Sequence, residues 1–431
     1  MKKAVYYYTK PLIEYMKTVP DPRCPREKKH DHAEILTYLI AGYVTGHTTV
    51  SRALKWARRH EKWLKTWLCI RNGIASASTV SRLLTGMDEE MFILAFTGWV
   101  GEILRSRDLH IAIDGKAIRA GMSKVTGSKT PMILSAVDAA TGIVLTQLPI
   151  KDKESEVTKI PKLLGILDIR GSVITTDAIG TTTGIMRYIK GSGGHFVQII
   201  KKNQPVSYDE IRELFEILEK EQKKEKETPG YQSGYSDFLE TYQKTRCFEI
   251  NRDRHEHRAY EVCHNTSMLK KTQKEWPFLM TVGRIRQTRI LVIRDSEGRD
   301  ITPNLEQFQK EGTYRQPIPT TGDSERDTTQ VIGVISDLKI TGKEMGKYRR
   351  SHWTIENRLH HVLDDTFRED RSPAKGSKNN LALVRKFAYN ILRIVMIQQS
   401  IEEPMTEVMD LLSDNLDLLG KYIFNGIQSF Y

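Results

Sequence analysis

Residues 109–114 read LHIAID, a short apolar run that ends in an acid and opens the part of the chain that decides the fold. Its composition and length predict a buried strand. Residues 132–150 (MILSAVDAATGIVLTQLPI) predict a β-hairpin that turns at Ala140, Thr141 and Gly142. The next four segments alternate between helix and strand: a helix at 155–168, a strand at 173–177 (VITTD), a helix at 181–191 and a strand at 195–202. The predicted order of elements is therefore βββαβαβ.

This order favours an α/β fold with the ribonuclease H-like layout, in which antiparallel strands come first and α/β units follow. In that layout the first and fourth strands lie side by side in the sheet. Asp114 and Asp177 stand at the ends of these two strands, so the layout brings their carboxylates together. This expectation follows from the fold and not from the spacing of the two acids in the sequence.

A third acid stands in residues 352–370, HWTIENRLHHVLDDTFRED. The apolar residues that follow Glu356 recur at three- and four-residue spacing, which predicts an α-helix with one buried stripe (Leu359, Val362, Leu363 and Phe367). At about 100° per residue, Glu356 borders this stripe, at the rim where a cleft would open. Taken alone, Glu356 could instead lie on the solvated face of a surface helix.

Asp114, Asp177 and Glu356 together form the kind of oxygen-donor set that holds a pair of divalent metal ions. We expect two Mg²⁺ ions, for which Mn²⁺ could substitute. An alternative set is Glu356, His360 and Asp364, which share one face of the predicted helix and could form a zinc site. Hard oxygen ligands from two strands explain the acids better, so magnesium is the expected cofactor.

The composition indicates a polyanionic partner. The chain has 431 residues and a formal net charge of +12 at pH 7, with a pI near 9.3, and nucleic acid is the commonest partner of such a protein. A basic protein without such a partner is the alternative. Four scattered cysteines argue against a disulfide framework. No secretory signal and no long apolar run are visible, so we expect a cytoplasmic, nucleoid-associated protein with no membrane span.

Changes in pattern along the chain predict four parts. They are an N-terminal helical, DNA-binding domain (1–105), a first part of the catalytic domain (106–205), a strand-rich insertion (206–334), and a second part of the catalytic domain with the Glu356 helix and C-terminal helices (335–431). Within the first part, Ser76 or Ser78 could cap a short helix that carries Thr79 and Arg82, as in a helix-turn-helix reading element. A plain bundle helix is the alternative. The apolar segment 381–398 predicts a helix that packs back on the sheet.

Several motifs resemble the ISAs-type, or H-repeat-associated, insertion-sequence transposases of the DDE class. They are IAIDGKAIR, the run from Lys153 to Glu156, TTDA, KKNQ, and above all HWTIENRLHHVLDDTFRED. The resemblance covers almost the whole chain, and it implies a ribonuclease H-like catalytic domain with Asp114, Asp177 and Glu356 as the metal-binding triad. Positions that depart from the family pattern all lie outside the triad (Glu154, Ser155, Thr181 to Thr183, Arg252, Asp253 and His361).

Side chains near the three acids are candidates for contacts with DNA. Those expected to hold phosphates are Lys116, Arg119, Lys201, Arg349, Arg350 and His352. Each of them could also be an ordinary surface residue. Trp353 could stack on a base near the cut or pack in the core, and Thr79 and Arg82 could read bases.

The resemblance implies a transposase that binds the terminal inverted repeats of its own element, cuts with metal-activated water and joins the freed 3′-hydroxyl to target DNA. The expected partners are double-stranded DNA, both terminal repeats and target, and a second copy of the chain, because synapsis of two ends implies a homodimer. A domesticated DNA-binding regulator and a stand-alone Mg²⁺-dependent nuclease are the alternatives.

Overall fold

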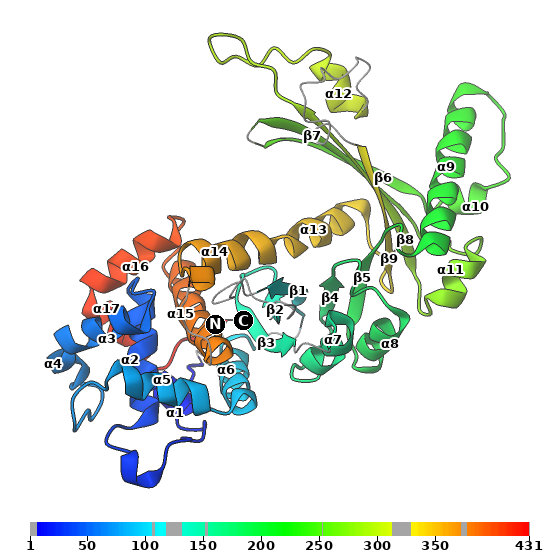
Figure 1. Ribbon diagram of the computed structural model, residues 1–431. Coiled ribbons are helices and arrows are strands. Elements are labelled where there is room, and N and C mark those ends of the chain that lie inside the picture. The colour runs from blue at the N-terminus through cyan, green and yellow to red at the C-terminus, as the bar shows by residue number, and fades with distance from the viewer. Residues whose placement is uncertain are drawn as a thin grey trace, which may run out of the picture. The chain divides into compact units, whose positions relative to one another are not determined.

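The computed structural model describes residues 7–105, 108–117, 132–150, 154–251, 253–312, 329–371 and 377–430. The chain forms two compact units, one made of Met1–Ser172 with Ser351–Tyr431 and the other of Val173–Arg350. Each unit combines helices with a sheet (Figure 1), so the α/β class predicted from the sequence is confirmed. Within the described residues no helix has both the length and the apolar character needed to cross a bilayer. All four cysteines are free.

The first unit begins with helices whose first turns are fixed by side-chain caps. The helices are α1 (Leu12–Met16), α2 (His32–Val44), α3 (Val50–Arg59), α4 (Glu61–Leu64), α5 (Ala77–Gly86) and α6 (Glu89–Ile103), with a 3₁₀ turn at Pro25–Glu27. Oxygens of Asp31, Thr49, Ser76 and Asp88 accept backbone N–H groups at the starts of α2, α3, α5 and α6, which satisfies donors that a helix start leaves unpaired. Ser76 is thus the cap expected from the sequence.

The sheet of the first unit has three antiparallel strands. They are β1 (His110–Ala117), β2 (Met132–Asp138) and β3 (Val144–Ile150), in the order β3-β2-β1. The register places Asp114 opposite Ser135. The predicted hairpin at residues 132–150 is confirmed, and Gly142 in its turn has a φ of 76°, a conformation that favours glycine. Helix α7 (Glu156–Leu164) packs on β2 and β3.

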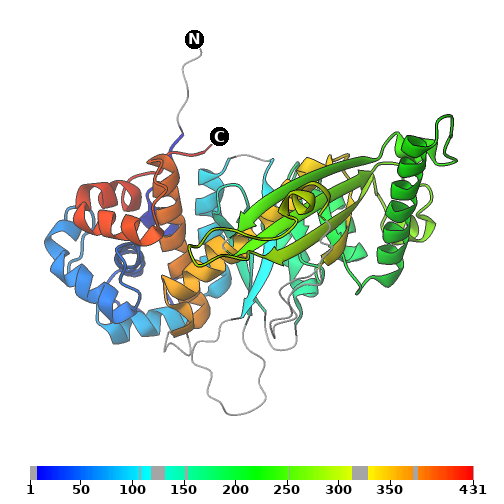
Figure 2. The same ribbon diagram turned by 90° about the horizontal axis from the view of Figure 1, so that it is seen from above.

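The C-terminal helices join the N-terminal ones in a single core. They are α14 (His361–Asp365), α15 (Lys378–Gln398), α16 (Met405–Asp414) and α17 (Leu416–Ile423). Helix α15 contacts α2 and α6, and the N-terminal and C-terminal helices lie side by side in both views (Figures 1 and 2). It also packs on the sheet, as predicted: the amide of Asn390 bonds in both directions with the backbone of Val144, at 2.9 Å each way.

The second unit is built on a six-stranded sheet. Its strands are β4 (Val173–Thr176), β5 (His195–Ile200), β6 (Gln243–Asn251), β7 (Arg254–Cys263), β8 (Thr281–Leu291) and β9 (Thr329–Ser336), in the order β4-β5-β9-β8-β7-β6. Only β4 and β5 pair in parallel; the remaining neighbours are antiparallel. The helices are α8 (Thr183–Gly191), α9 (Pro205–Glu227), α10 (Ser236–Leu239), α11 (Lys270–Glu275), α12 (Leu305–Glu311) and α13 (Gly342–His352), which runs to the edge of the unit. The strand-rich segment thus extends the sheet beyond β5.

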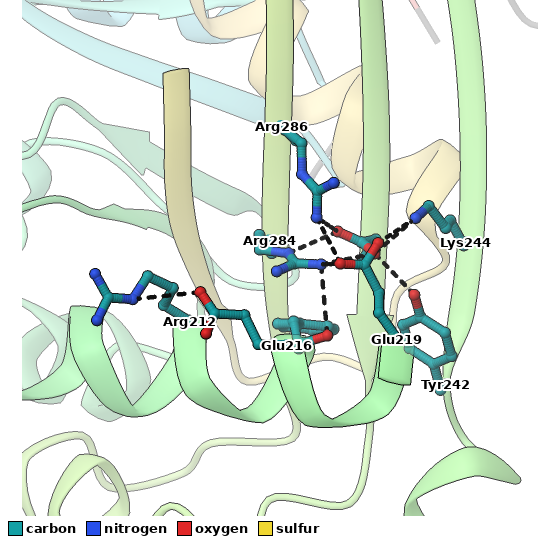
Figure 3. A network of polar contacts seen from close by, with 9 residues as sticks. Arg212, Glu216, Glu219, Tyr242, Lys244, Arg284 and Arg286 are labelled. Carbon is teal, nitrogen blue, oxygen red and sulfur yellow. Dashed lines mark hydrogen bonds and ion pairs between the residues drawn. The ribbon is translucent and has the colours of Figure 1, made fainter. Parts of the chain in front are cut away.

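A buried charge network fastens α9 to this sheet. Glu261 on β7 is fully buried, and its carboxylate accepts two hydrogen bonds from Arg284 on β8, at 2.7 and 3.0 Å. Glu219 on α9 reaches the same cluster, where it pairs with Lys244 at 2.5 Å and with Arg284 and Arg286 at 2.7 Å each (Figure 3). Bidentate, charge-assisted bonds of this kind are the strong ones in proteins.

The compact units do not follow the limits of the predicted domains. Helices of residues 1–105 share their core with α15, because α2 and α6 pack directly against it. The limits of the two compact units fall instead after Ser172 and after Arg350. The predicted division at residues 105, 205 and 334 stays a prediction.

Candidate active site

Strand β1 presents Asp114 and Lys116 on the same face, because side chains two residues apart in a strand point the same way. The Asp114 side chain keeps 29% of its surface exposed, and its Oδ1 accepts the Gly115 N–H at 2.9 Å. Gly115 itself points to the opposite face, where a Cβ would lie 2.3 Å from Oε1 of Glu156. The glycine after Asp114 thus leaves room for the start of α7.

The segment that carries Glu356 is a π-helical turn, Ile355–His360, placed between α13 and α14. The sequence predicts regular α-helix here, and this prediction is wrong. The apolar stripe is nevertheless confirmed in its buried members, since Leu359, Leu363 and Phe367 are at most 1% exposed. A π-turn bonds residue i to i+5 and often occurs at functional sites.

The π-turn contacts β1. Glu356 lies on its exposed side, while His360 turns inward and brings Nδ1 to 3.6 Å from Oδ2 of Asp114. Burial lowers the pKa of His360 to about 3, and the nearby ammonium groups of Lys386 and Lys116 act in the same direction. The imidazole is therefore neutral at pH 7.

Behind Asp114 lies a buried cluster of charges. The ammonium of Lys116, only 9% exposed, donates to Asp364 at 2.5 Å and to Glu369 at 2.8 Å. Glu369 is 3% exposed and also lies 3.7 Å from the guanidinium of Arg385. Burial alone would raise the pKa of Glu369, but the surrounding cations outweigh this effect and the net pKa is lowered.

Lys386, next to Arg385 on α15, is fully enclosed. It donates to Ser135 on β2 at 3.0 Å and to the amide oxygen of Gln147 on β3. Burial lowers its pKa to about 7, although Glu369 partly compensates. The sequence analysis missed Arg385 and Lys386. Two adjacent basic residues in the middle of a strongly apolar helix were the signal that could have found them.

Asp177 follows β4 in the second unit. Its Oδ1 accepts the backbone N–H groups of Ile179 and Gly180, at 2.9 and 3.1 Å, which closes a turn and fixes the carboxylate at the strand end. The side chain is half-buried. Asp177 thus follows its strand as expected, whereas Asp114 lies inside β1, three residues before the strand ends at Ala117. Glu356 lies on a helical segment.

Two family models match the chain. One, described as a transposase DDE domain, matches residues 105–391 and so spans more than half of the sequence, including Asp114, Asp177 and Glu356. The other, described as DDE_Tnp_1-associated, matches residues 13–100. The chain belongs to the DDE transposases. It is therefore an enzyme of that type.

Similar proteins carry related names. The putative transposase YncI of Escherichia coli O157:H7 is 26% identical to this transposase over 385 residues, covering 89% of this chain and 87% of that protein. The H repeat-associated putative transposase YhhI of Escherichia coli (strain K12) is 26% identical over 388 residues, covering 89% and 90%. Among solved structures, a chain from the piggyBac transposase synaptic complex with hairpin DNA is 10% identical and covers 93% of this chain and 75% of that chain, at a TM-score of 0.38. That score is too low to establish a shared fold.

The residues predicted to hold phosphates differ in burial and in the groups to which they bond. Lys116 is committed to two carboxylates and is not presented to solvent, so its expected phosphate contact is not what the structure shows. His352 is buried. Arg350 is exposed and paired with Glu249, Arg349 is half-buried, and Lys201 is exposed. Arg119 lies outside the described residues.

Trp353 and the α5 residues are more accessible. Trp353 is 45% exposed, so the alternative of a core tryptophan does not hold. Arg82 is exposed on α5, whereas the hydroxyl of Thr79 bonds to Ser76 within the cap.

Within the described part of the chain, no three His, Cys, Asp or Glu side chains are close enough together to hold a metal ion. The residues of the zinc alternative lie in different surroundings: Asp364 bonds to Lys116, His360 is half-buried beside Asp114, and Glu356 is exposed. The partly exposed carboxylate of Asp114 offers the hard oxygen donors that Mg²⁺ prefers, and the neutral imidazole beside it does not compete as a cation.

Proposed function

We propose that this transposase binds the terminal inverted repeats of its own element, cleaves DNA with two Mg²⁺ ions and joins the 3′-hydroxyl to target DNA. Asp114, Asp177 and Glu356 are the proposed metal ligands, and Mn²⁺ would substitute for Mg²⁺. Synapsis of two ends would need a homodimer. The proposal also takes the catalytic domain to be ribonuclease H-like, with β1 beside β4, so that Asp177 meets Asp114.

One observation carries this proposal most directly. The turn that bears Glu356 packs on the strand that bears Asp114, and a neutral histidine from that turn lies 3.6 Å from the aspartate. The carboxylate of Asp114 is partly exposed, whereas Glu369 behind it is buried and bonded to Lys116. Exposed carboxylate oxygens can be reached by a divalent cation from solution.

The side chains of this transposase would hold the metal ions, and its backbone N–H groups orient their carboxylates. When bound, two Mg²⁺ ions activate the attacking water and stabilise charge on the attacking and leaving oxygens. The Gly115 N–H orients the carboxylate of Asp114, and the Ile179 and Gly180 N–H groups orient that of Asp177. Lys201, Arg349 and Arg350 are proposed to hold phosphates beside the cut, and Thr79 and Arg82 to contact the terminal repeat.

The test separates chemistry from binding. Asp114→Asn and Asp177→Asn each keep the side-chain volume but remove a charge, so we expect cleavage of DNA carrying the terminal repeat to disappear with Mg²⁺ or Mn²⁺. Binding to the same DNA should persist, because the carboxylates hold metals and not phosphates. Folded variants that lose binding and cleavage together would contradict these roles.

A joining assay distinguishes the alternatives. A transposase transfers a pre-cleaved end into a supercoiled plasmid, whereas a nuclease of the same fold cuts without joining. A regulator binds repeats and does neither.

A further inference from the structure

We infer that the exposed face of α3, formed by Arg52, Lys55 and Arg59, binds the phosphate backbone of duplex DNA. These three residues are called the α3 stripe below. The inference rests on the proposed function for the nature of the partner. It concerns a surface built from other residues than the acids, so it can fail while the proposed chemistry stands.

The region around α3 concentrates much of the positive charge of the chain. Between Ile35 and Met87 the sequence has eight Lys and Arg residues and one acid, Glu61, which gives +7 of the total +12. All eight basic residues are exposed, and Glu61 is already paired with Lys65 at 2.7 Å. Like charges gathered in one region repel each other, so this density is typical of a surface that meets a polyanion.

The α3 stripe occupies one side of its helix. At about 100° per residue, positions 52, 55 and 59 fall within an arc of roughly 60° and span about 10 Å along the axis. The opposite side packs in the core, where Ala53, Leu54 and Ala57 are fully buried. No acid among the described residues pairs with the three side chains. Duplex DNA carries one charge per about 1.7 Å of axis, so a stripe of this length reaches several phosphates.

Helix α3 is rigidly held and is joined to the start of α5. A Cβ on Gly42 of α2 would lie 2.7 Å from that of Ala53, which shows how closely α2 and α3 pack. Arg58 donates to the carbonyl of Ala75 at 3.0 Å, directly before the Ser76 cap of α5. The exposed N-terminal turn of α5, the positive end of its helix dipole, therefore continues the basic surface.

The same surface does not suit the other common partners. A protein interface has an apolar or aromatic centre, but α3 and α5 expose no large hydrophobic side chain; Trp67 is the one exposed in residues 35–87. A helix that lies on a membrane inserts its apolar face, and that face of α3 is buried in the core. The exposed surface of α3 and α5 is positively charged and has no large apolar side chain, which suits duplex DNA.

The test is the salt dependence of binding. The full-length chain is titrated onto a labelled duplex of arbitrary sequence over a series of salt concentrations, and the slope of log K against log salt is measured. The test variant is Arg52→Gln/Lys55→Gln/Arg59→Gln. The matched control is Lys220→Gln/Lys223→Gln/Lys226→Gln, which removes the same charge from exposed positions of α9.

Each lost phosphate contact should make the slope shallower by about 0.9. We therefore expect a change of roughly 2 to 3 in the α3 variant, a similar loss of affinity for every duplex sequence, and a change of less than about 1 in the control. If the triple variant is misfolded by circular dichroism, the three single variants carry the test, with a shift of about 0.9 each.

An unchanged slope in the α3 variants, or an equal change in the α9 control, overturns the inference. So does a variant that loses affinity for anionic vesicles while its slope on DNA is unaltered. Cleavage by the wild-type chain is scored separately. If the wild-type chain cleaves DNA but the α3 variant has an unchanged salt slope, only the inference about α3 is contradicted. If the salt slope of the α3 variant changes but the wild-type chain does not cleave, only the proposed chemistry is contradicted.

Discussion

Lys116 and Glu369 lie 253 residues apart in the chain, and yet the ammonium of one donates to the carboxylate of the other at 2.8 Å. The pair connects β1 with the segment that follows the π-turn, and both side chains are buried. It therefore fixes the strand of Asp114 against the segment of the π-turn without facing solvent.

The first prediction concerns this pair. Lys116→Met should lower the free energy of unfolding by about 3–5 kcal/mol, because it leaves the carboxylate of Glu369 buried without its main partner. Urea denaturation measures the change. Adding Glu369→Leu should restore much of the loss, since an apolar pair can replace a buried ion pair. A Lys116→Met protein of wild-type stability but weakened DNA binding would show that Lys116 holds phosphate after all.

The second prediction concerns pH. Lys386 has a pKa of about 7 in the folded chain against an ordinary value of 10.5, so unfolding takes up a proton at any pH between them. Stability contributed by the neutral form therefore rises with pH across this window. From pH 7 to 9 the gain should be roughly 2 kcal/mol, measured by denaturation at each pH. Lys386→Met should lose this gain, and the exposed control Lys421→Met should keep it.

The third prediction asks which acid near the π-turn is catalytic. Glu356→Gln should eliminate Mg²⁺-dependent cleavage, whereas the exposed Asp365→Asn should leave it largely intact. Asp364 and Glu369 both bond to Lys116, so Glu369→Gln should lower cleavage only partly, through the fold. Gel assays of cleavage rate decide. A dead Asp364→Asn or Glu369→Gln enzyme beside an active Glu356→Gln enzyme would mean that the third ligand is misassigned.

The fourth prediction concerns Trp353, which is 45% exposed. Trp353→Ala should change the free energy of unfolding by no more than about 0.5 kcal/mol, as for most surface positions. If the indole stacks on a base near the cut, the same change should weaken binding of a frayed DNA end by about 1–3 kcal/mol. Trp353→Phe should recover most of that affinity. Equal binding by wild type and Trp353→Ala rules out stacking.

The fifth prediction compares two acids of the second unit. Glu261→Gln should cost about 3–5 kcal/mol of stability, because Arg284 then loses its buried bidentate partner. Glu216 on α9 pairs with Arg212 at 3.7 Å with both side chains about half exposed (Figure 3), so Glu216→Gln should cost less than about 1 kcal/mol. Similar losses in the two variants would mean that the network does not hold α9 on the sheet.

Features governed by local pattern were predictable from the sequence. The strand at LHIAID, the hairpin at 132–150, the Ser76 cap and the buried stripe of Leu359, Leu363 and Phe367 all depend on periodicity or on turn chemistry within a few residues. Asp177 likewise follows its strand as expected, whereas β1 runs on past Asp114 to Ala117.

Features set by distant packing were not predictable. No amino-acid pattern distinguishes this π-turn from α-helix. The choice between i+4 and i+5 hydrogen bonds depends on how the segment packs on β1. The burial of Lys116 required knowledge that Glu369 and Arg385 fold against it. The meeting of Asp114 with Asp177 depends on tertiary arrangement in the same way, and it stays a prediction.

The orientation of the side chains at the candidate site depends on the number of residues in the π-turn, Ile355–His360. A turn closed by i+5 bonds holds one residue more than an α-turn, so removing a single residue there would allow ordinary α-helix to form. Every side chain on the far side of the deletion would then rotate by about 100°, and Glu356 and His360 could no longer keep their present places while Leu359 and Leu363 stay buried. The orientation of Glu356 thus depends on the number of residues in the turn. A relative with one residue fewer in this turn would need another residue in the role proposed for Glu356.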